Sequence, residues 1–78
     1  MKPSKLYKML SKTIDSKQSF VISPLGNKPS SDDIKIISDP MITYYGFVDA
    51  FNIAKKQGKF IMGKYDNVSY KFYVVEVA

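Results

Sequence analysis

The chain has 78 residues and a formal net charge of +5, and all twelve of its positive charges are lysines. It contains no histidine, cysteine, tryptophan or arginine, so imidazole and thiol chemistry, disulfides and thiolate metal ligands are excluded. The composition therefore argues against an enzyme, and we expect neither a metal site nor a cofactor.

The length allows one small domain, residues 1–78. Hydrophobic residues make up 45% of the chain, which predicts a folded rather than a disordered protein. No segment approaches the roughly 18 apolar residues that cross a bilayer, and the first residues lack the apolar core of a secretory signal. We expect a cytoplasmic protein with no membrane span.

The first predicted element is an amphipathic helix over about residues 4–16. Its apolar side chains recur every four residues, which is the helical period, at Leu6, Leu10 and Ile14. The opposite side of this helix carries a lysine stripe, made of Lys5, Lys8 and Lys12. Such a stripe is a solvated helix face, a contact surface for an acidic protein or nucleic acid, or a contact surface for a membrane.

The middle of the chain predicts two short strands and a second helix. Residues 19–23 and 34–38 have strand composition, and the segment between them is rich in Pro, Gly, Asn and Ser and predicts a loop. A helix is predicted over about residues 47–57, ended by Gly58. Residues 40–46 fit either a helix start or an extended segment, and we favour a short extended segment at 41–45.

The last third predicts a β-hairpin with strands at 59–65 and 68–77. They flank Asp66 and Asn67, which tolerate the left-handed backbone of a tight two-residue turn. The second of these strands is apolar on both faces near its end, so we expect it to lie at the centre of the sheet or to be covered on both sides.

A two-residue turn would place Ile61 opposite Phe72 on one face of the hairpin and Phe60 opposite Tyr73 on the other. The first face is apolar and predicts the core. The second face is either core beneath a helix, or an exposed patch for a partner protein or for a second copy of the chain in a homodimer.

The order of these elements predicts an α+β fold, in which a small antiparallel sheet of three to five strands packs against two helices. Charge is unevenly distributed along the chain: residues 1–17 hold five lysines, residues 55–78 hold five more, and the segment between them is weakly acidic. If the two ends meet in the fold, they would form one positive face.

The sequence favours a non-enzymatic protein that binds a macromolecule. Lysines and aromatic rings interleave in the hairpin, as they do in platforms for single-stranded nucleic acid. The candidate contact residues are Lys5, Lys8, Lys12, Phe60, Lys64, Lys71 and Tyr73. The expected partner is an acidic protein surface, and the alternative is non-specific nucleic-acid binding through the same lysines.

The amino-acid usage, with lysine in place of arginine, is typical of AT-rich coding. It suggests a phage or mobile-element accessory protein that acts in the host cytoplasm and inhibits a host protein by docking on it.

Overall fold

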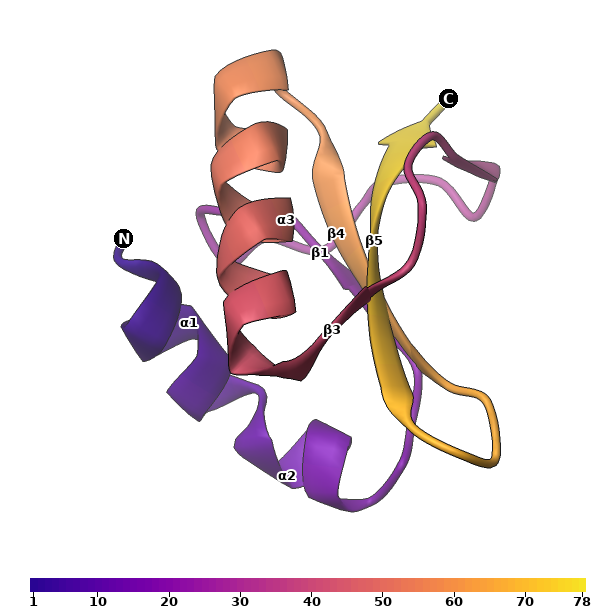
Figure 1. The fold of residues 1–78 in the computed structure, drawn as a ribbon. Helices are drawn as coiled ribbons and strands as arrows, with labels where there is room; N and C mark the ends of the chain where they lie inside the picture. Colours follow the sequence, from indigo (N-terminus) through magenta and orange to yellow (C-terminus); the bar gives the residue numbers. More distant parts are fainter.

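The computed structural model describes all 78 residues and has an antiparallel sheet of five strands with three helices, an α+β arrangement (Figure 1). The helices are α1 (Pro3–Met9), α2 (Ser11–Asp15) and α3 (Thr43–Gln57). The strands are β1 (Phe20–Ile22), β2 (Ile34–Ile36), β3 (Met41–Ile42), β4 (Phe60–Tyr65) and β5 (Tyr70–Val77). The predicted fold class and the C-terminal hairpin are confirmed. None of the helices is both long and apolar enough to cross a bilayer.

Strand β5 is the centre of the sheet, as its sequence predicts. The strand order is β1-β4-β5-β2, and β3 also pairs with β5. Neighbouring residues Val74 and Val75 point to opposite faces of the sheet, and both are buried. Both faces of β5 are therefore covered near its end.

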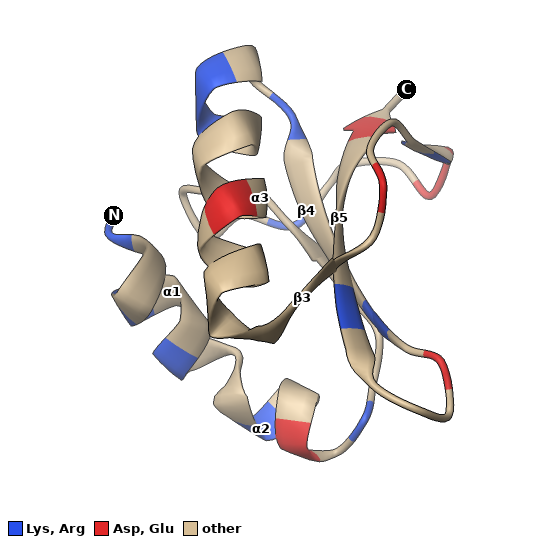
Figure 2. Cartoon of the chain, viewed as in Figure 1, with Lys and Arg blue, Asp and Glu red and all other residues tan.

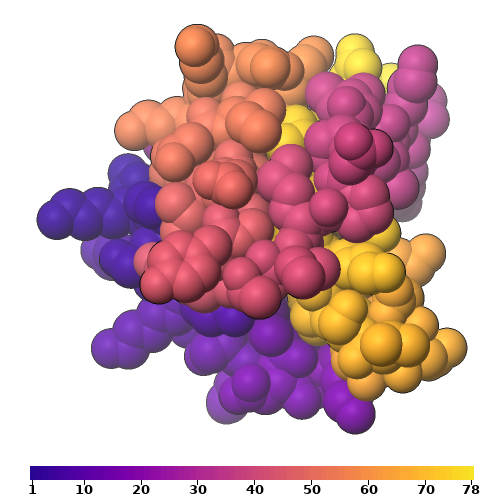
Figure 3. Space-filling view, viewed as in Figure 1, coloured from indigo at the N-terminus to yellow at the C-terminus, as the bar shows by residue number.

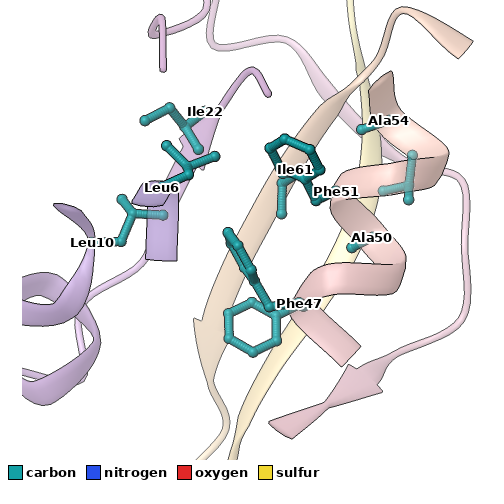
Figure 4. Close-up of a cluster of buried hydrophobic side chains, with 10 residues drawn as sticks. Leu6, Leu10, Ile22, Phe47, Ala50, Phe51, Ala54 and Ile61 are labelled. Carbon is teal, nitrogen blue, oxygen red and sulfur yellow. The ribbon is translucent and has the colours of Figure 1, made fainter. Parts of the chain in front are cut away.

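The main core lies between the sheet and the helices. Phe47, Ala50, Phe51 and Ala54 of α3 face the sheet, where they meet residues such as Ile61 of β4 (Figure 4). The N-terminal helices add Leu6 and Leu10 to the same cluster. All of these side chains are apolar, and no polar or charged side chain is buried.

The predicted first helix is divided at Leu10, which adopts φ −91° and ψ 0° between α1 and α2. The hydroxyl of Ser11 donates to the carbonyl of Lys8 at 2.8 Å, a local hydrogen bond of the kind that bends helices. The chain then leaves α2 through Lys17, which has φ +59°. This helix end has the hydrogen bonds of a Schellman motif, from Lys17 to Ile14 and from Gln18 to Thr13.

The second predicted helix begins four residues earlier than expected, at Thr43, and the predicted extended segment is limited to the two residues of β3. Gly46 permits this arrangement, because a Cβ on it would lie 2.8 Å from the backbone of Met41. The C-terminal end matches the prediction: Gly58 is left-handed at φ +66°, and the N–H of Lys59 donates to Ala54.

The hairpin register differs from the prediction by two residues. Phe60 pairs with Val75 instead of Tyr73, and Ile61 pairs with Val74 instead of Phe72. The predicted faces are still correct, because side chains alternate with a period of two along a strand. The cause is a loop of four residues, 66–69, in place of a two-residue turn.

The side chain of Asp66 organises this longer loop. Its Oδ1 atom accepts from the N–H groups of Val68 at 3.1 Å and Ser69 at 3.0 Å, which is an Asx-type turn. Only Asn67 adopts a left-handed conformation, with φ +76°. Val68 is consequently 85% exposed at the tip of the hairpin rather than paired with the first strand.

Residues 24–33 form the predicted loop between β1 and β2. Because β4 and β5 separate these two strands, the loop must cross the sheet, and it passes behind the sheet in the view of Figure 1. Residues Lys28 and Pro29 of the loop line a cavity together with Met62, whose side chain lies on the sheet face opposite the helices. The loop therefore covers part of that outer face.

Candidate functional site

Most lysines of the protein have no ion-pair partner. Lys59 lies 3.6 Å from Glu76, and Lys71 pairs with Asp66, and these are the ion pairs of the molecule. Figure 2 shows lysines along α1 and α2, at the end of α3 and in the hairpin. The net charge of +5 is thus spread over the surface and available to an acidic partner.

The lysine stripe is fully on the surface. Lys5, Lys8 and Lys12 are all exposed, and α1 and α2 turn their apolar side toward the core. This places the stripe in the helix layer of the fold.

The other predicted contact residues lie on the outer face of the sheet. Phe60, Lys64, Lys71 and Tyr73 alternate with the buried residues of β4 and β5 and therefore share the face turned away from the helices. Only Lys64 is exposed, and Phe60 and Tyr73 are half-buried. The sheet separates these four residues from the lysine stripe, so the predicted contact residues form two groups rather than one.

Lys71 is committed to the hairpin. Its ammonium pairs with the Asp66 carboxylate, and this contact holds the pKa of Lys71 above its ordinary value of 10.5. The hydrogen bond from Lys71, together with the N–H groups of Ser69 and Val68, holds the pKa of Asp66 well below 3.8. The charge of Lys71 is largely balanced by Asp66, so Lys71 attracts an acidic partner less strongly than an unpaired lysine does.

Two hairpin tyrosines are also used inside the molecule. The hydroxyl of Tyr70 donates to the carbonyl of Gln18, and the ring of Tyr70 stacks on Phe20 with centroids 6.2 Å apart. Partial burial raises the pKa of the Tyr70 hydroxyl. The ring of Tyr65 lies beneath the ammonium of Lys17. Both rings are therefore already engaged in contacts within the molecule.

A tyrosine patch, made of Tyr7, Tyr44 and Tyr45, was missed by the sequence analysis. Tyr44 lies edge-on to Tyr7 at 5.1 Å and contacts Tyr45 at 6.0 Å between ring centroids. Exposure increases outward, from half-buried Tyr7 to 37% for Tyr44 and 78% for Tyr45. A helix start at residue 43 would have placed Tyr45 on the same outer side as Asn52 and Lys56, and so would have identified it.

The patch lies where β3 passes into α3. Figure 3 shows that α3 and the residues just before it occupy the middle of one face, between the N-terminal helices and the C-terminal hairpin. Thr43 at this junction has φ +66°, a conformation that is strained for a β-branched residue. Tyr7 is followed in α1 by Lys8, an exposed member of the lysine stripe, so the patch and the stripe are joined through neighbouring residues of one helix.

The other end of α3 carries a hollow that we call the end pocket. It has a volume of about 290 Å³ and lies between Met1, the loop after β1, the end of α3 and the start of β4. Its lining is mostly apolar and includes Pro24, Leu25, Ala54 and Phe60, with Lys55 and Lys59 also contributing.

No group of three or more histidine, cysteine, aspartate or glutamate side chains is placed to hold a metal ion. No family model, no curated protein and no solved structure matches the chain. The functional interpretation therefore depends on the surface itself.

Proposed function

We propose that this chain is a non-enzymatic protein that docks on an acidic surface of another protein. The lysine stripe would guide the approach, and the tyrosine patch beside it would hold the complex. The observation that carries the proposal is the exposure of Tyr45, which is 78% accessible yet joined through Tyr44 to Tyr7 and the lysine-bearing helix.

Each part of this surface has a physical role in association. Unpaired lysines accelerate encounter with an acidic surface and select against basic ones. Tyrosine is enriched among the residues that dominate binding energy, because it buries a large ring and keeps a polar hydroxyl at its edge. A ring already packed against a neighbour loses less side-chain freedom when it binds.

The strained backbone of Thr43, where β3 passes into α3, supports the assignment of the binding site to the tyrosine patch. A β-branched residue with positive φ costs about 1–3 kcal/mol and persists only where its surroundings enforce it, often at binding sites. Thr43 directly precedes Tyr44 and Tyr45, so its backbone sets the direction in which both rings leave the chain.

Docking would also explain how a small non-enzymatic protein could inhibit its target. An acidic surface covered by this chain would be closed to the target's other ligands. The phage or mobile-element origin suggested by the composition would fit such a role.

The test is affinity capture followed by measurement with the purified partner. The wild type and Tyr45→Ala are compared, with Val68→Ala as control because Val68 is also exposed but lies at the hairpin tip. We expect Tyr45→Ala to weaken binding at least about tenfold, Val68→Ala to have little effect, and the association rate to fall as salt increases. Unchanged affinity for Tyr45→Ala would contradict the proposal.

The same proteins distinguish the nucleic-acid alternative. A non-specific nucleic-acid binder would be retained on DNA at low salt, with an affinity that falls steeply and linearly with the logarithm of salt concentration. Tyr45→Ala would not alter the salt slope, whereas removal of the lysine stripe would reduce it.

A further inference from the structure

The end pocket lies at the opposite end of α3 from the tyrosine patch and is formed by the end of α3, the start of β4, the loop after β1 and Met1, whose side chain reaches this loop near Gly26. Gly58 ends the helix in a left-handed conformation, so the chain turns sharply into β4 at Phe60. The loop after β1 closes the third side with Pro24, which is buried, and Leu25, which is 70% exposed. Leu25 therefore extends the apolar surface of the hollow, and contiguous exposed apolar surface marks contact sites.

The charge around this hollow is positive. Lys55 lines the pocket and has no ion-pair partner, whereas the charge of Lys59, which also lines it, is partly neutralised by Glu76, with 3.6 Å between Nζ and Oε1. Lys56 follows at the end of the same helix. The apolar interior would favour an uncharged group, while the lysines would favour carboxylates next to it.

We infer that the end pocket receives one large apolar side chain from an acidic segment of the partner protein. The inference rests on the proposed function, and it adds a second anchor with a defined chemistry. The volume of about 290 Å³ lies just below the usual range for ligand sites, and it is large enough for a leucine or phenylalanine side chain.

The approach to the pocket is open on the side of Gly58. A Cβ on Gly58 would meet no atom within 4 Å, so the backbone of a partner segment can pass close to the turn. A second copy of this chain is a poor occupant, because each copy carries a net charge of +5 and would repel the other. An acidic partner complements both the pocket and its surroundings.

The experiment uses three short synthetic peptides and the ¹⁵N-labelled full chain. The first peptide has glutamates around one central phenylalanine, the second has alanine in place of the phenylalanine, and the third has lysines around the phenylalanine. We expect the first to shift the amide signals of Leu25, Gly58 and Phe60 and to bind at least about fivefold more tightly than the second. The third should not bind, because its lysines have the same charge as the lysines that line the pocket.

Two pairs of variants test whether the glutamate–phenylalanine peptide binds at the end pocket. Lys55→Glu is compared with Lys56→Glu, which makes the same change of charge on the next residue of the helix but does not line the pocket. Leu25→Ser is compared with Val68→Ser, since both residues are exposed in loops. We expect Lys55→Glu and Leu25→Ser to weaken binding of the glutamate–phenylalanine peptide several-fold more than their controls.

Equal binding of the phenylalanine and alanine peptides, or shifts confined to other parts of the surface, would overturn the inference. So would equal effects of Lys55→Glu and Lys56→Glu. Those outcomes would leave the proposed function intact, because it is tested separately by Tyr45→Ala against the natural partner.

Discussion

The ammonium of Lys17 lies 5.0 Å from the centre of the Tyr65 ring, so the end of α2 contacts the tip of the hairpin nearly fifty residues later in the chain. Next to it, the hydroxyl of Tyr70 donates to the carbonyl of Gln18. The two contacts attach the segment between α2 and β1 to the hairpin. They explain why rings that resemble a stacking platform in the sequence are occupied in the fold.

The first prediction concerns the energy of that contact. A double-mutant cycle with Lys17→Met and Tyr65→Leu should give a coupling of about 0.5–1 kcal/mol, the size of an exposed cation–π interaction. The free energy of unfolding is measured by urea titration at neutral pH. Additive effects of the two substitutions would show that the contact does not stabilise the fold.

The second prediction concerns Gly63, where an added Cβ would overlap the rings of Phe20 and Tyr70. Gly63→Ala should lower the free energy of unfolding by about 2–3 kcal/mol, because the packed rings cannot both move away. The backbone of Gly63 has no positive φ, so the cost is steric. The control is Lys64→Ala, at the exposed neighbouring position, which should change stability by less than about 0.5 kcal/mol. Replacing one ring with a smaller side chain, in the double variant Gly63→Ala/Phe20→Leu, should recover part of the lost stability.

The third prediction concerns pH. The folded pKa of Asp66 lies below its ordinary value of 3.8, so the unfolded chain binds the proton more readily and stability rises with pH. The contribution of this carboxylate is complete above about pH 4 and is lost as pH falls toward the folded pKa. Asp66→Asn should therefore be less stable than the wild type at neutral pH, and the difference should shrink below pH 4. The measurement is urea unfolding from pH 7 to pH 2, and a constant difference over that range would contradict it.

The fourth prediction concerns Thr43, whose φ of +66° disfavours a residue with a branched Cβ. Thr43→Gly should raise the free energy of unfolding by about 1 kcal/mol, since glycine adopts this conformation without strain. Thr13→Gly, within α2, is the matched control and should give no gain. A loss of stability in Thr43→Gly would mean that the threonine side chain contributes more than its backbone costs.

The sequence predicted the elements with strong periodic patterns. Leu6, Leu10 and Ile14 mark the first helix by their spacing, and Gly58 marks the end of the last one by its tolerance of a left-handed backbone. The alternation along β4 and β5 identified the correct faces even though the register was wrong, because a shift of two residues preserves the face.

The parts that could not be predicted depend on contacts between distant residues or on a side chain that acts on its own backbone. The turn of the hairpin is decided by the Asp66 carboxylate, which closes a four-residue loop that composition alone does not distinguish from a two-residue turn. The start of α3 is decided by the packing of Gly46 against Met41. Without that start, the sequence pattern does not assign Tyr45 to the surface, and it indicates the lysine stripe and the hairpin instead.

The pairing of the strands also sets an order of assembly. β1 pairs only with β4, and both β2 and β3 pair only with β5, whereas β4 and β5 are neighbours in the chain and can close a hairpin by themselves. Folding should consequently begin near the C-terminal end, where the loop to be closed is shortest. The strands β1, β2 and β3 have no strand to pair with until the β4–β5 hairpin has formed. The amides of β4 and β5 should therefore be the slowest to exchange with deuterium.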